Sequence, residues 1–397
     1  MSRIDELIEK LCPDGVEYKA LGEFGSVDRG GSFQKKDFVE EGMPCIHYGQ
    51  IYTKYGLHAF ETLTFVDESV FKKSKKASPG DVVMAVTSEN MEDVCKCVTW
   101  LGDSDVAVSG HTAIIRHDQN PKYMTYYFRS SAFEADKRKL AHGTKVIEVT
   151  PVKLLDVRIP IPPMEVQEEI VRVLDSFAEL EAELEAELEA RRRQYAYYRG
   201  RVLSIEQLEK TSGQKVEFRQ LGDLVEILDS MRRPVKREKR ISGAYPYYGA
   251  NGVQDFIDDY IFDGAFLLVG EDGTVATESG APVVNWAEGR IWVNNHAHVL
   301  AERKEGASLR FLKYALECTN ITSAVQGVPP KLNQKNLRGI LVPTPSPAAQ
   351  HIVASALDEF DALVNDIYQG IPAEIEARRK QYAYYRDKLL TFKERTA

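Results

Sequence analysis

Two long stretches of the chain carry apolar residues three, four or seven positions apart, which is the spacing of one helix face. In the first stretch these residues are Leu174, Phe177, Leu180, Leu184, Leu188, Tyr195 and Tyr198. In the second they are Leu357, Phe360, Leu363, Ile367, Ile375, Tyr382 and Tyr385. Gly370-Ile371-Pro372 interrupts the second stretch and predicts a break or kink there. Two such stripes in one chain predict an antiparallel coiled coil formed within the molecule.

The remaining regions contain short apolar runs bounded by turn residues, which predict β-strands. We expect strands at Gly80–Val86 and Thr112–Ile115, and again at Gly264–Val269 and Ala297–Leu300. Helices are expected at Tyr123–Phe133 and Leu309–Glu317. Both regions therefore have the pattern of an α+β domain with many short strands.

The chain repeats itself. Ala190-Arg-Arg-Arg-Gln-Tyr-Ala-Tyr-Tyr-Arg199 returns as Ala377-Arg-Arg-Lys-Gln-Tyr-Ala-Tyr-Tyr-Arg386. Pro160, Gln167, Leu174-Asp175 and Phe177 return as Pro343, Gln350, Leu357-Asp358 and Phe360, and Val16-Glu17-Tyr18 returns as Val216-Glu217-Phe218. Three matched blocks in the same order indicate an internal duplication. The helical parts are nearly copied, whereas the globular parts have diverged.

The duplication predicts two globular domains of the α+β class that alternate along the chain with two helical regions. We expect an N-terminal helix at 1–15, a first globular domain at 16–163 and a helical region at 164–204. A second globular domain with its lead-in segment is expected at 205–346, and a second helical region at 347–397.

Composition places the chain among ordinary globular proteins, with 43% hydrophobic and 28% charged residues. The acidic, amphipathic start at Met1–Cys12 resembles neither a signal peptide nor a membrane span. The five cysteines have no zinc-binding spacing, and free thiols in a reducing cytoplasm are expected. The net charge of −9 opposes DNA binding at first sight. However, six of the 60 acidic residues lie between Glu179 and Glu189, and removing them leaves 54 acidic against 51 basic residues.

Amide, aromatic and basic side chains cluster in four segments expected to be loops, namely Tyr48–Tyr55, Thr87–Asn90, Tyr247–Asn251 and Lys331–Lys335. Such side chains on glycine-flanked loops suit base edges and phosphates. His111 and His296 occupy matching places before a strand, where a structural role is the alternative to a DNA contact. The candidate DNA-contacting residues are Tyr48, Gln50, Tyr52, Lys54, Lys73, Lys76, Thr87, Ser88, Asn90, His111, Lys145, Tyr247, Tyr248, Asn251, Asp272, Asn295, His296, Lys331, Asn333 and Lys335.

The helical regions carry two further signals. Three units of Leu-Glu-Ala, two of them completed by a further Glu, follow one another from Leu180 to Ala190, and each four-residue unit adds about 6 Å to a helix. They suit a helical spacer that sets the distance between two DNA-binding domains. The alternative is an ordinary surface helix composed of residues with high helix propensity. The arginine–tyrosine blocks favour helix packing or partner docking over direct DNA contact. The spacer and docking candidates are Leu180, Leu184, Leu188, Arg192, Tyr195, Tyr198, Arg379, Tyr382 and Tyr385.

Sequence motifs for catalysis are missing. The chain has no Gly-Lys dipeptide for a phosphate-binding loop, no Gly-x-Gly-x-x-Gly and no Asn/Asp-Pro-Pro-aromatic motif of adenine methyltransferases. Asp14, Glu17 and Lys19 imitate a nuclease motif but lie too close together, and Arg219 replaces the lysine in the second copy. We expect no catalytic residue, no metal site and no cofactor in this chain.

The chain as a whole resembles the specificity subunits of type I restriction–modification systems. The resemblance rests on the two Gln-Tyr-Ala-Tyr-Tyr-Arg blocks, the Pro160–Asp175 pattern with its copy, Tyr247-Tyr248-Gly249-Ala250-Asn251-Gly252 and Asp263-Gly264-Ala265-Phe266. It implies two α/β target recognition domains on double-stranded DNA, separated by two long antiparallel conserved helices with pseudo-twofold symmetry. Each domain would bind one half of a bipartite, asymmetric site in defence against foreign DNA. It also implies docking of two modification (methyltransferase) subunits and of restriction subunits. AdoMet, ATP and Mg²⁺ would belong to those partners.

Two other functional classes remain open at this stage. One is a coiled-coil scaffold whose globular halves bind proteins rather than DNA. The other is an enzyme, either a standalone methyltransferase or a nuclease.

Overall fold

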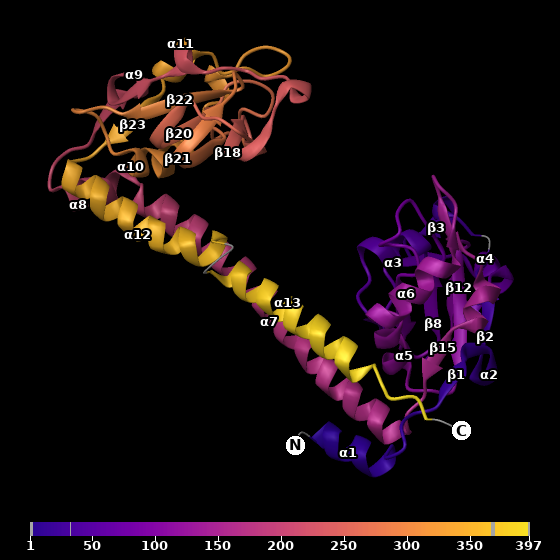
Figure 1. Cartoon of the computed structure of the whole chain (residues 1–397). Coiled ribbons are helices and arrows are strands. Elements are labelled where there is room, and N and C mark those ends of the chain that lie inside the picture. Colours follow the sequence, from indigo (N-terminus) through magenta and orange to yellow (C-terminus); the bar gives the residue numbers. More distant parts are fainter. Residues whose placement is uncertain (1–2, 32, 367–369, 396–397) are drawn as a thin grey trace. The chain divides into compact units, whose positions relative to one another are not determined.

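The computed structural model describes residues 3–31, 33–366 and 370–395. The chain divides into two compact units (Figure 1). Unit 1 comprises residues 1–184 and 375–397, and unit 2 comprises residues 185–374. Each unit therefore contains one globular domain and parts of the long helical segments.

Unit 1 is built on two five-stranded sheets, a three-stranded sheet and a strand pair. The first sheet has the order β2 (Gly25–Arg29), β12 (Thr112–His117), β8 (Val82–Ala85), β10 (Cys97–Trp100), β5 (His58–Ala59). The second has the order β3 (Phe38–Val39), β6 (Thr64–Val66), β4 (Met43–Ile46), β11 (Val106–Val108), β7 (Lys76–Ala77). The third has the order β13 (Ala141–His142), β14 (Ile147–Val149), β9 (Thr87–Ser88), and β1 (Tyr18–Ala20) pairs with β15 (Arg158–Pro160). The strands predicted at Gly80–Val86 and Thr112–Ile115 are confirmed as β8 and β12.

Short helices complete unit 1. They are α1 (Arg3–Leu11), α2 (Leu21–Phe24), α3 (Tyr48–Thr53), α4 (Glu68–Lys73), α5 (Pro121–Tyr127) and α6 (Ser131–Leu140), with 3-10 turns η1 (Lys35–Asp37) and η2 (Pro151–Asp156). The single helix predicted at Tyr123–Phe133 is wrong, because α5 ends at Tyr127 and Ser130 caps the separate helix α6. Its hydroxyl accepts a hydrogen bond from the Phe133 N–H at 3.3 Å.

The segment Tyr48–Tyr55 was predicted to be a loop, and this prediction is wrong for most of its length. It forms α3, because His47 and Gln50 cap its first turn reciprocally. The Gly49 N–H donates to His47 Nδ1 at 3.2 Å, and the His47 N–H donates to Gln50 Oε1 at 3.2 Å. Two otherwise unpaired donors are satisfied in this way, which stabilises a short helix.

Unit 2 is built on a six-stranded sheet with the order β17, β22, β20, β21, β18, β19, and on the separate pair β16–β23. The bounds are β16 (Glu217–Gln220), β17 (Val225–Ile227), β18 (Ser242–Gly249), β19 (Gly252–Ile257), β20 (Phe262–Gly270), β21 (Val284–Val293), β22 (Ala297–Glu302) and β23 (Leu341–Thr344). Its helices are α8 (Ile205–Ser212), α9 (Leu221–Leu224), α10 (Leu309–Glu317) and α11 (Gln334–Arg338), with 3-10 turns η3 (Asp229–Met231), η4 (Arg237–Lys239) and η5 (Thr322–Ala324).

The sequence located several elements of unit 2. The strands predicted at Gly264–Val269 and Ala297–Leu300 are confirmed within β20 and β22, and the helix predicted at Leu309–Glu317 is α10. The loop predicted at Tyr247–Asn251 is partly wrong, because Tyr247 and Tyr248 belong to β18. Their aromatic side chains pair well across a sheet, so β-propensity prevailed over the turn signal of the glycine that follows.

The duplicated start of each copy forms the same local structure. β1, α2 and β2 follow one another in unit 1, as β16, α9 and β17 do in unit 2. The Leu21 N–H donates to the Val157 carbonyl at 2.9 Å, and the Leu221 N–H donates to the Ile340 carbonyl at 2.8 Å. The duplication predicted from sequence is therefore visible in the backbone.

Three long helices carry the copied sequence, namely α7 (Met164–Val202), α12 (Pro347–Asn365) and α13 (Ile371–Leu389). The interruption predicted around Gly370 is confirmed, since α12 ends at Asn365 and α13 begins at Ile371. Ile367, which the predicted stripe includes, lies outside the described residues. Across the described part of the chain, none of the helices combines the length and the apolar character that crossing a bilayer requires.

Within each unit, the first copy packs against the second. In unit 1, Phe177 of α7 stacks on Tyr385 of α13 with ring centroids 5.5 Å apart. In unit 2, Phe360 of α12 stacks on Tyr195 of α7 with centroids 6.5 Å apart. Each phenylalanine thus meets a tyrosine of the other copy's Gln-Tyr-Ala-Tyr-Tyr-Arg block. The packing is reciprocal, as an internal pseudo-twofold duplication requires.

The helices in unit 1 run antiparallel. Phe177 lies against Tyr385, whereas Glu181, one turn later on α7, pairs with Arg379 at 2.7 Å. Residue numbers therefore rise on α7 as they fall on α13. This direction agrees with the coiled coil predicted from the two stripes.

A buried glutamine joins each globular domain to its long helix. Gln167 Oε1 accepts a hydrogen bond from the Asn120 N–H at 3.0 Å, and its Nε2 donates to the Pro162 carbonyl at 2.8 Å. Gln350 Oε1 accepts from the Ser308 N–H at 2.9 Å. Its Nε2 donates to the Pro345 carbonyl at 2.9 Å. The glutamine amide thus satisfies the first turn of α5 in unit 1 and of α10 in unit 2.

Candidate nucleic-acid interface

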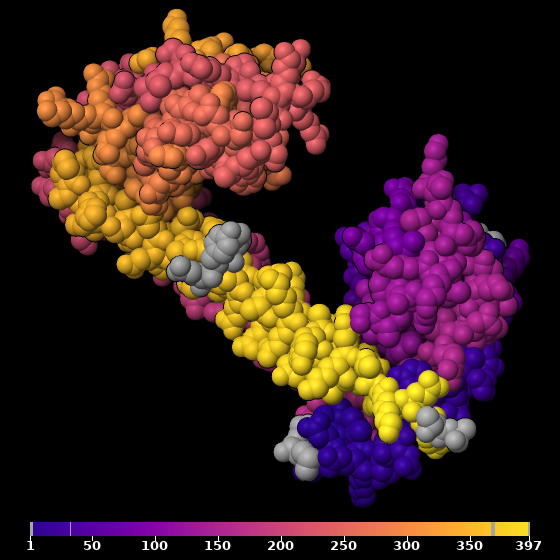
Figure 2. All heavy atoms as spheres, viewed as in Figure 1, coloured from indigo at the N-terminus to yellow at the C-terminus, as the bar shows by residue number. Residues whose placement is uncertain are grey.

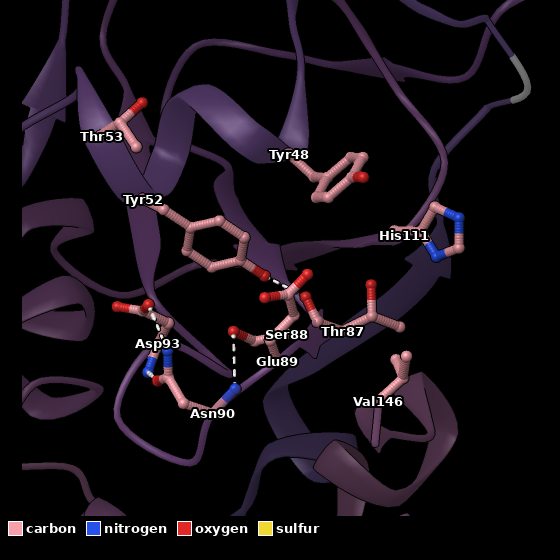
Figure 3. A pocket seen from close by; sticks show the side chains of 10 residues that line it. All are labelled: Tyr48, Tyr52, Thr53, Thr87, Ser88, Glu89, Asn90, Asp93, His111 and Val146. Atoms are coloured by element: carbon pink, nitrogen blue, oxygen red, sulfur yellow. Dashed lines mark hydrogen bonds between the residues drawn. The ribbon is translucent and has the colours of Figure 1, made fainter. Parts of the chain in front are cut away.

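A pocket on unit 1 brings together six of the candidate residues. They come from α3, from β9 and the turn after it, and from the loop before β12, and their side chains converge in Figure 3. The pocket has a volume of about 460 Å³. Its candidate residues are Tyr48, Tyr52, Thr87, Ser88, Asn90 and His111. Thr53, Glu89, Asp93 and Val146 also line it, and none of these four is among the sequence candidates.

One wall of this pocket is aromatic. The Tyr48 ring lies 5.2 Å from the His111 ring and 6.2 Å from the Tyr52 ring, measured between centroids. Tyr52 donates its hydroxyl hydrogen to the Thr87 carbonyl, which ties α3 to β9. Burial, reinforced by the nearby Asp93 carboxylate, raises the pKa of Tyr52 well above its ordinary value. The Tyr52 hydroxyl therefore stays protonated and holds the wall in place.

The opposite rim is polar. Asn90 Nδ2 donates to the Asp93 carboxylate at 2.8 Å, and the Asp93 N–H donates to Asn90 Oδ1 at 2.8 Å. A hydrogen bond from Lys96, the strongest influence, lowers the pKa of Asp93, so this carboxylate is ionised at neutral pH. Hydroxyl, amide and carboxylate groups beside aromatic rings supply the donors and acceptors that read base edges.

His111 has an unusual backbone. Its φ angle is +64°, in the left-handed region that side chains other than glycine rarely adopt. The side chain is exposed at the mouth of the pocket, and its ring contacts Tyr48. Such outliers concentrate at functional sites. His111 therefore lines the pocket and belongs to none of the described core clusters.

The other candidates of unit 1 are spread more widely. Lys54, Lys73 and Lys145 are exposed, in positions from which an ammonium group could reach a phosphate. Lys76 is half-buried, with its ammonium 5.0 Å from the centre of the Phe71 ring. Gln50 accepts hydrogen bonds from the His47 N–H and from Thr64 Oγ1, so its side chain stabilises α3.

Unit 2 has a backbone segment beside the end of β20 that is equivalent to the segment around Thr87 in the pocket of unit 1. The Glu271 N–H donates to the His296 carbonyl at 2.8 Å, as the Val86 N–H donates to the His111 carbonyl at 2.9 Å. Asp272 therefore takes the place of Thr87, and its carboxylate contacts His296 Nδ1 at 2.5 Å. Asn295, His296 and Lys331 are exposed beside it. The structure thus groups four of the candidates of unit 2 along one edge: Asp272, Asn295, His296 and Lys331.

The remaining candidates of unit 2 have more local roles. Tyr247 is buried, its hydroxyl accepts from the Val235 N–H at 3.0 Å, and Arg240 lies over its ring at 4.1 Å. Tyr248 is half-buried against a core cluster of β20, β21 and β22, and Asn251 is exposed in the turn between β18 and β19. Asn333 caps α11 by accepting from the Asn336 N–H. Lys335, on α11, is exposed.

Sequence reasoning missed a basic loop in unit 2. Residues 232–240 precede β18 and include four exposed basic side chains: Arg233, Lys236, Arg237 and Lys239. The signal was present in the sequence as a local excess of arginine and lysine. Such a loop supplies the positive charge that phosphate groups require.

Unit 2 also contains a buried ionic cluster. Asp229, Glu271 and His298 lie close enough to hold a cation. However, Arg232 pairs with Glu271 at 2.6 Å and with Asp229 at 3.6 Å. His298 contacts Asp229 through Nδ1 at 2.6 Å and the Leu332 carbonyl through Nε2 at 2.7 Å. Both ring nitrogens and both carboxylates are thus already engaged, so this donor set does not fit a metal ion.

The spacer and docking candidates lie on the long helices. Tyr195 is buried, Tyr382 is half-buried, and Tyr198 and Tyr385 are partly exposed where they pack on phenylalanine. Leu184 and Leu188 are half-buried, whereas Leu180 is exposed. Arg192 is exposed, and Arg379 is exposed while pairing with Glu181.

The two copied blocks also contain a matched pair of exposed tyrosines that is not among the docking candidates. Tyr197 is 59% exposed and Tyr384, at the same place in the second block, is 62% exposed. Each packs edge-on against the tyrosine that follows it, with centroids 5.4 Å apart for the first pair and 5.3 Å for the second. The helix stripe could not reveal them, because they face away from it.

Comparison with known proteins agrees with this architecture. The protein family described as type I restriction modification DNA specificity domain matches residues 13–190 and again residues 213–377. The two matches cover most of the chain and follow its internal duplication. The chain therefore belongs to this family of specificity proteins.

Several named relatives belong to type I restriction systems. A Haemophilus influenzae protein that carries the name of a type I restriction enzyme specificity subunit is 37% identical over 47% of this chain and 49% of its own length. A Mycoplasma pneumoniae protein with the name of a type I specificity subunit is 32% identical over 60% of this chain and 98% of its own. A type I restriction enzyme specificity subunit of Escherichia coli is 29% identical over 59% of this chain and 63% of its own. The chain thus spans about half the length of the first of these relatives.

Solved structures show the same fold. The crystal structure of a type I restriction–modification S subunit from M. genitalium superposes with a TM-score of 0.55 at 16% identity, covering 95% of this chain and 96% of that one. A structure from work on complex assembly and conformational transition of the type I system superposes with a TM-score of 0.57 at 16% identity, covering 95% and 97%. At this identity the likeness establishes the fold and nothing further.

Proposed function

We propose that this chain is a non-catalytic specificity subunit that recognises a bipartite, asymmetric sequence in double-stranded DNA, one half-site with each unit. One observation carries the proposal. The same backbone hydrogen-bond pattern, from Val86 to His111 in unit 1 and from Glu271 to His296 in unit 2, occurs in both units, with different side chains at equivalent positions. In unit 1 the backbone of Thr87 pairs with that of Glu148 of β14, and in unit 2 the backbone of Asp272 pairs with that of Lys331. Thr87 therefore corresponds to Asp272, and Glu148 corresponds to Lys331. Two domains with the same backbone framework but different hydrogen-bond donors and acceptors would recognise different base sequences.

The pocket of unit 1 is the candidate base-reading surface for the first half-site. Aromatic rings, hydroxyls and the Asn90 amide face it, and exposed lysines supply phosphate contacts nearby. In unit 2 the edge around Asp272 and His296 takes this role, with the basic loop 232–240 on the phosphates. Positive charge near each edge offsets the acidity of the chain, which is concentrated between Glu179 and Glu189.

The test uses the chain assembled with its modification subunits. Asn90→Ala and His111→Ala should relax the sequence preference of the first half-site only, by roughly tenfold per lost base contact. Mapping of the methylated adenines in cellular DNA reports both half-sites at once. Glu168→Ala, an exposed change on α7, is the matched control. If the two variants leave the first half-site unchanged, or alter both half-sites equally, unit 1 does not read it through this pocket.

We also propose that α7 sets the distance between the half-sites. The Leu-Glu-Ala units lie inside this one continuous helix. Deleting Leu184–Glu187 removes about 6 Å and about 40° of helix rotation. The expected result is a shorter gap, by about two base pairs, between unchanged half-sites. A fixed gap in the deletion variant would show that another element sets the distance.

The duplicated tyrosines are the candidate docking points for partners. Two copies of one exposed aromatic and arginine surface suit two copies of one partner, here the modification subunit. AdoMet would belong to that subunit, and ATP and Mg²⁺ to a restriction subunit that joins the complex. Native mass spectrometry tests the assignment: Tyr197→Ala or Tyr384→Ala alone should leave a complex with one modification subunit, and the double variant should leave none. Full assembly in the double variant would refute it.

A further inference from the structure

A hairpin with an apolar tip projects from unit 1. β13 and β14 pair through Ala141 with Val149 and His142 with Glu148, and the tip comprises residues 143–146. Gly143 begins the tip with a φ of +104°, and a β-carbon there would lie 2.0 Å from the Val146 carbonyl oxygen, so only glycine fits. Val146 is 58% exposed. A narrow magenta projection in the colour range of this hairpin stands out from the surface of unit 1 in Figure 2.

Unit 2 has a similar hairpin at the equivalent place in the repeat. The Gln326 N–H donates to the Lys331 carbonyl at 2.9 Å, and the Lys331 N–H donates back to the Gln326 carbonyl at 2.8 Å. The tip comprises residues 327–330, and it also begins with a glycine of positive φ, here +84°. Val328 follows, and its side chain is fully exposed at 101%.

The two hairpins are attached to equivalent backbone positions. In unit 1 the Val149 N–H donates to the Val86 carbonyl at 2.9 Å. In unit 2 the Leu332 N–H donates to the Glu271 carbonyl at 2.8 Å. Each hairpin therefore rests on the strand that continues into the candidate base-reading edge. Val146 itself lines the pocket of unit 1.

A single exposed valine is ordinary on a protein surface. Here, however, two domains with diverged sequences keep a glycine-started hairpin at one structural position, and each hairpin has an exposed valine in its tip, Val146 as the fourth tip residue and Val328 as the second. Neither valine serves a core, since both point into solvent. A structural role does not explain them, and a contact with a ligand of each domain does.

The surrounding charge indicates what that ligand is. Lys145 is exposed beside Val146, and Lys331, which also pairs with Glu271 at 3.1 Å, is exposed at the base of the second tip. Lysine beside an apolar tip suits a surface that presents phosphate outside and apolar groups inside. Double-stranded DNA has this character: side chains reach thymine methyl groups in the major groove or wedge between base steps in the minor groove.

We infer that Val146 and Val328 each make an apolar contact with the base pairs of their own half-site, so that the two hairpins are additional specificity elements. The inference rests on the proposed function, because it assumes that each unit binds one half-site. The inference adds one residue per unit and an apolar type of contact, which the polar side chains around Thr87 and Asp272 cannot make. The contact removes the valine methyl groups from water on binding.

The test compares Val146→Ser and Val328→Ser in the chain assembled with its modification subunits. Competition binding to duplexes that differ in one half-site at a time measures each preference separately. Each variant should weaken binding roughly ten- to fifteenfold, the value of two buried methyl groups. The loss should vanish when the matching half-site is scrambled and persist when the other is scrambled. Val253→Ser, an exposed valine on β19, is the matched control and should leave binding unchanged.

Two further arms identify the type of contact. Duplexes with uracil in place of thymine remove the methyl group, and a thymine contact would make the wild-type and serine variants bind them equally. A wedge would instead bend the duplex, and the serine variants would reduce this bend in a gel-mobility permutation assay. Either result supports the inference. Unchanged affinity and preference in both serine variants, with half-site discrimination intact, would overturn it and leave the proposed function standing. Loss of discrimination in the wild-type complex would overturn the proposed function itself.

Discussion

Replacing the buried glutamine of one unit should loosen that unit and leave the other unchanged. Gln350→Leu keeps the side-chain size but removes both hydrogen bonds, so the Ser308 N–H and the Pro345 carbonyl lose their partners. A buried polar group without a partner costs about 1–3 kcal/mol. Two such groups, partly offset by the more apolar leucine, give about 3 kcal/mol. Gln167→Leu should have a similar effect in unit 1.

Hydrogen exchange followed by mass spectrometry resolves the two units. A loss of about 3 kcal/mol speeds exchange through local opening by roughly 150-fold. Gln350→Leu should produce this change in α10, and Gln167→Leu should produce it in α5. The controls are His351→Ala and Glu168→Ala, each an exposed neighbour of one glutamine on the same helix. The reasoning is refuted if α10 changes less than fivefold in Gln350→Leu, if the controls change as much, or if either variant affects both units alike.

Three further predictions concern other buried or packed groups. Burial lowers the pKa of His117 to about 4, so the unfolded chain takes up this proton near pH 6.5, before the folded chain does. The free energy of unfolding should therefore fall between pH 6.5 and pH 4, by up to about 3 kcal/mol, and urea midpoints of His117→Phe should fall less over this window. Phe360→Ala removes the stack on Tyr195, which should cost about 1–2 kcal/mol and speed hydrogen exchange in residues 185–202 about 5- to 30-fold; unchanged protection would contradict the packing. Cys318 is the exposed residue among the five cysteines, so iodoacetamide should label it first. Labelling should be faster at higher pH, because partial burial of the thiol group raises the pKa of Cys318. Earlier labelling of a buried cysteine would argue against the fold.

Local pattern located much of the secondary structure. Val82–Ala85 is a continuous apolar run and forms a fully buried central strand, as expected of a strand covered on both faces. The helix at Leu309–Glu317 was predicted to the residue, since its apolar positions recur with helical spacing. Tyr48–Thr53 was missed as a helix, because the stabilising hydrogen bonds involve the His47 imidazole, which ordinary capping rules do not anticipate.

The candidate site was predicted less completely. Six side chains predicted on unit 1 do meet in one pocket, but Asp93 and Val146 also belong to it. Neither was chosen from the sequence, because a lone carboxylate and a lone valine carry no pattern that indicates a nucleic-acid contact. Gln50 had a suitable amide, yet the fold uses that amide to hold α3. Residue type indicates what a side chain can do, whereas its neighbours decide whether it is available.

The sequence by itself determined the duplication, the long helices and most of the strands, because these depend on spacing between nearby residues and on comparison of the chain with itself. Only the tertiary structure decided that each phenylalanine of one copy packs on tyrosines of the other, that Gln167 and Gln350 satisfy equivalent helix ends, and that the two valine-tipped hairpins lie beside equivalent edges. These contacts join residues that are far apart in the chain. Their energies come from burial and from hydrogen bonds between distant groups, which no local pattern records.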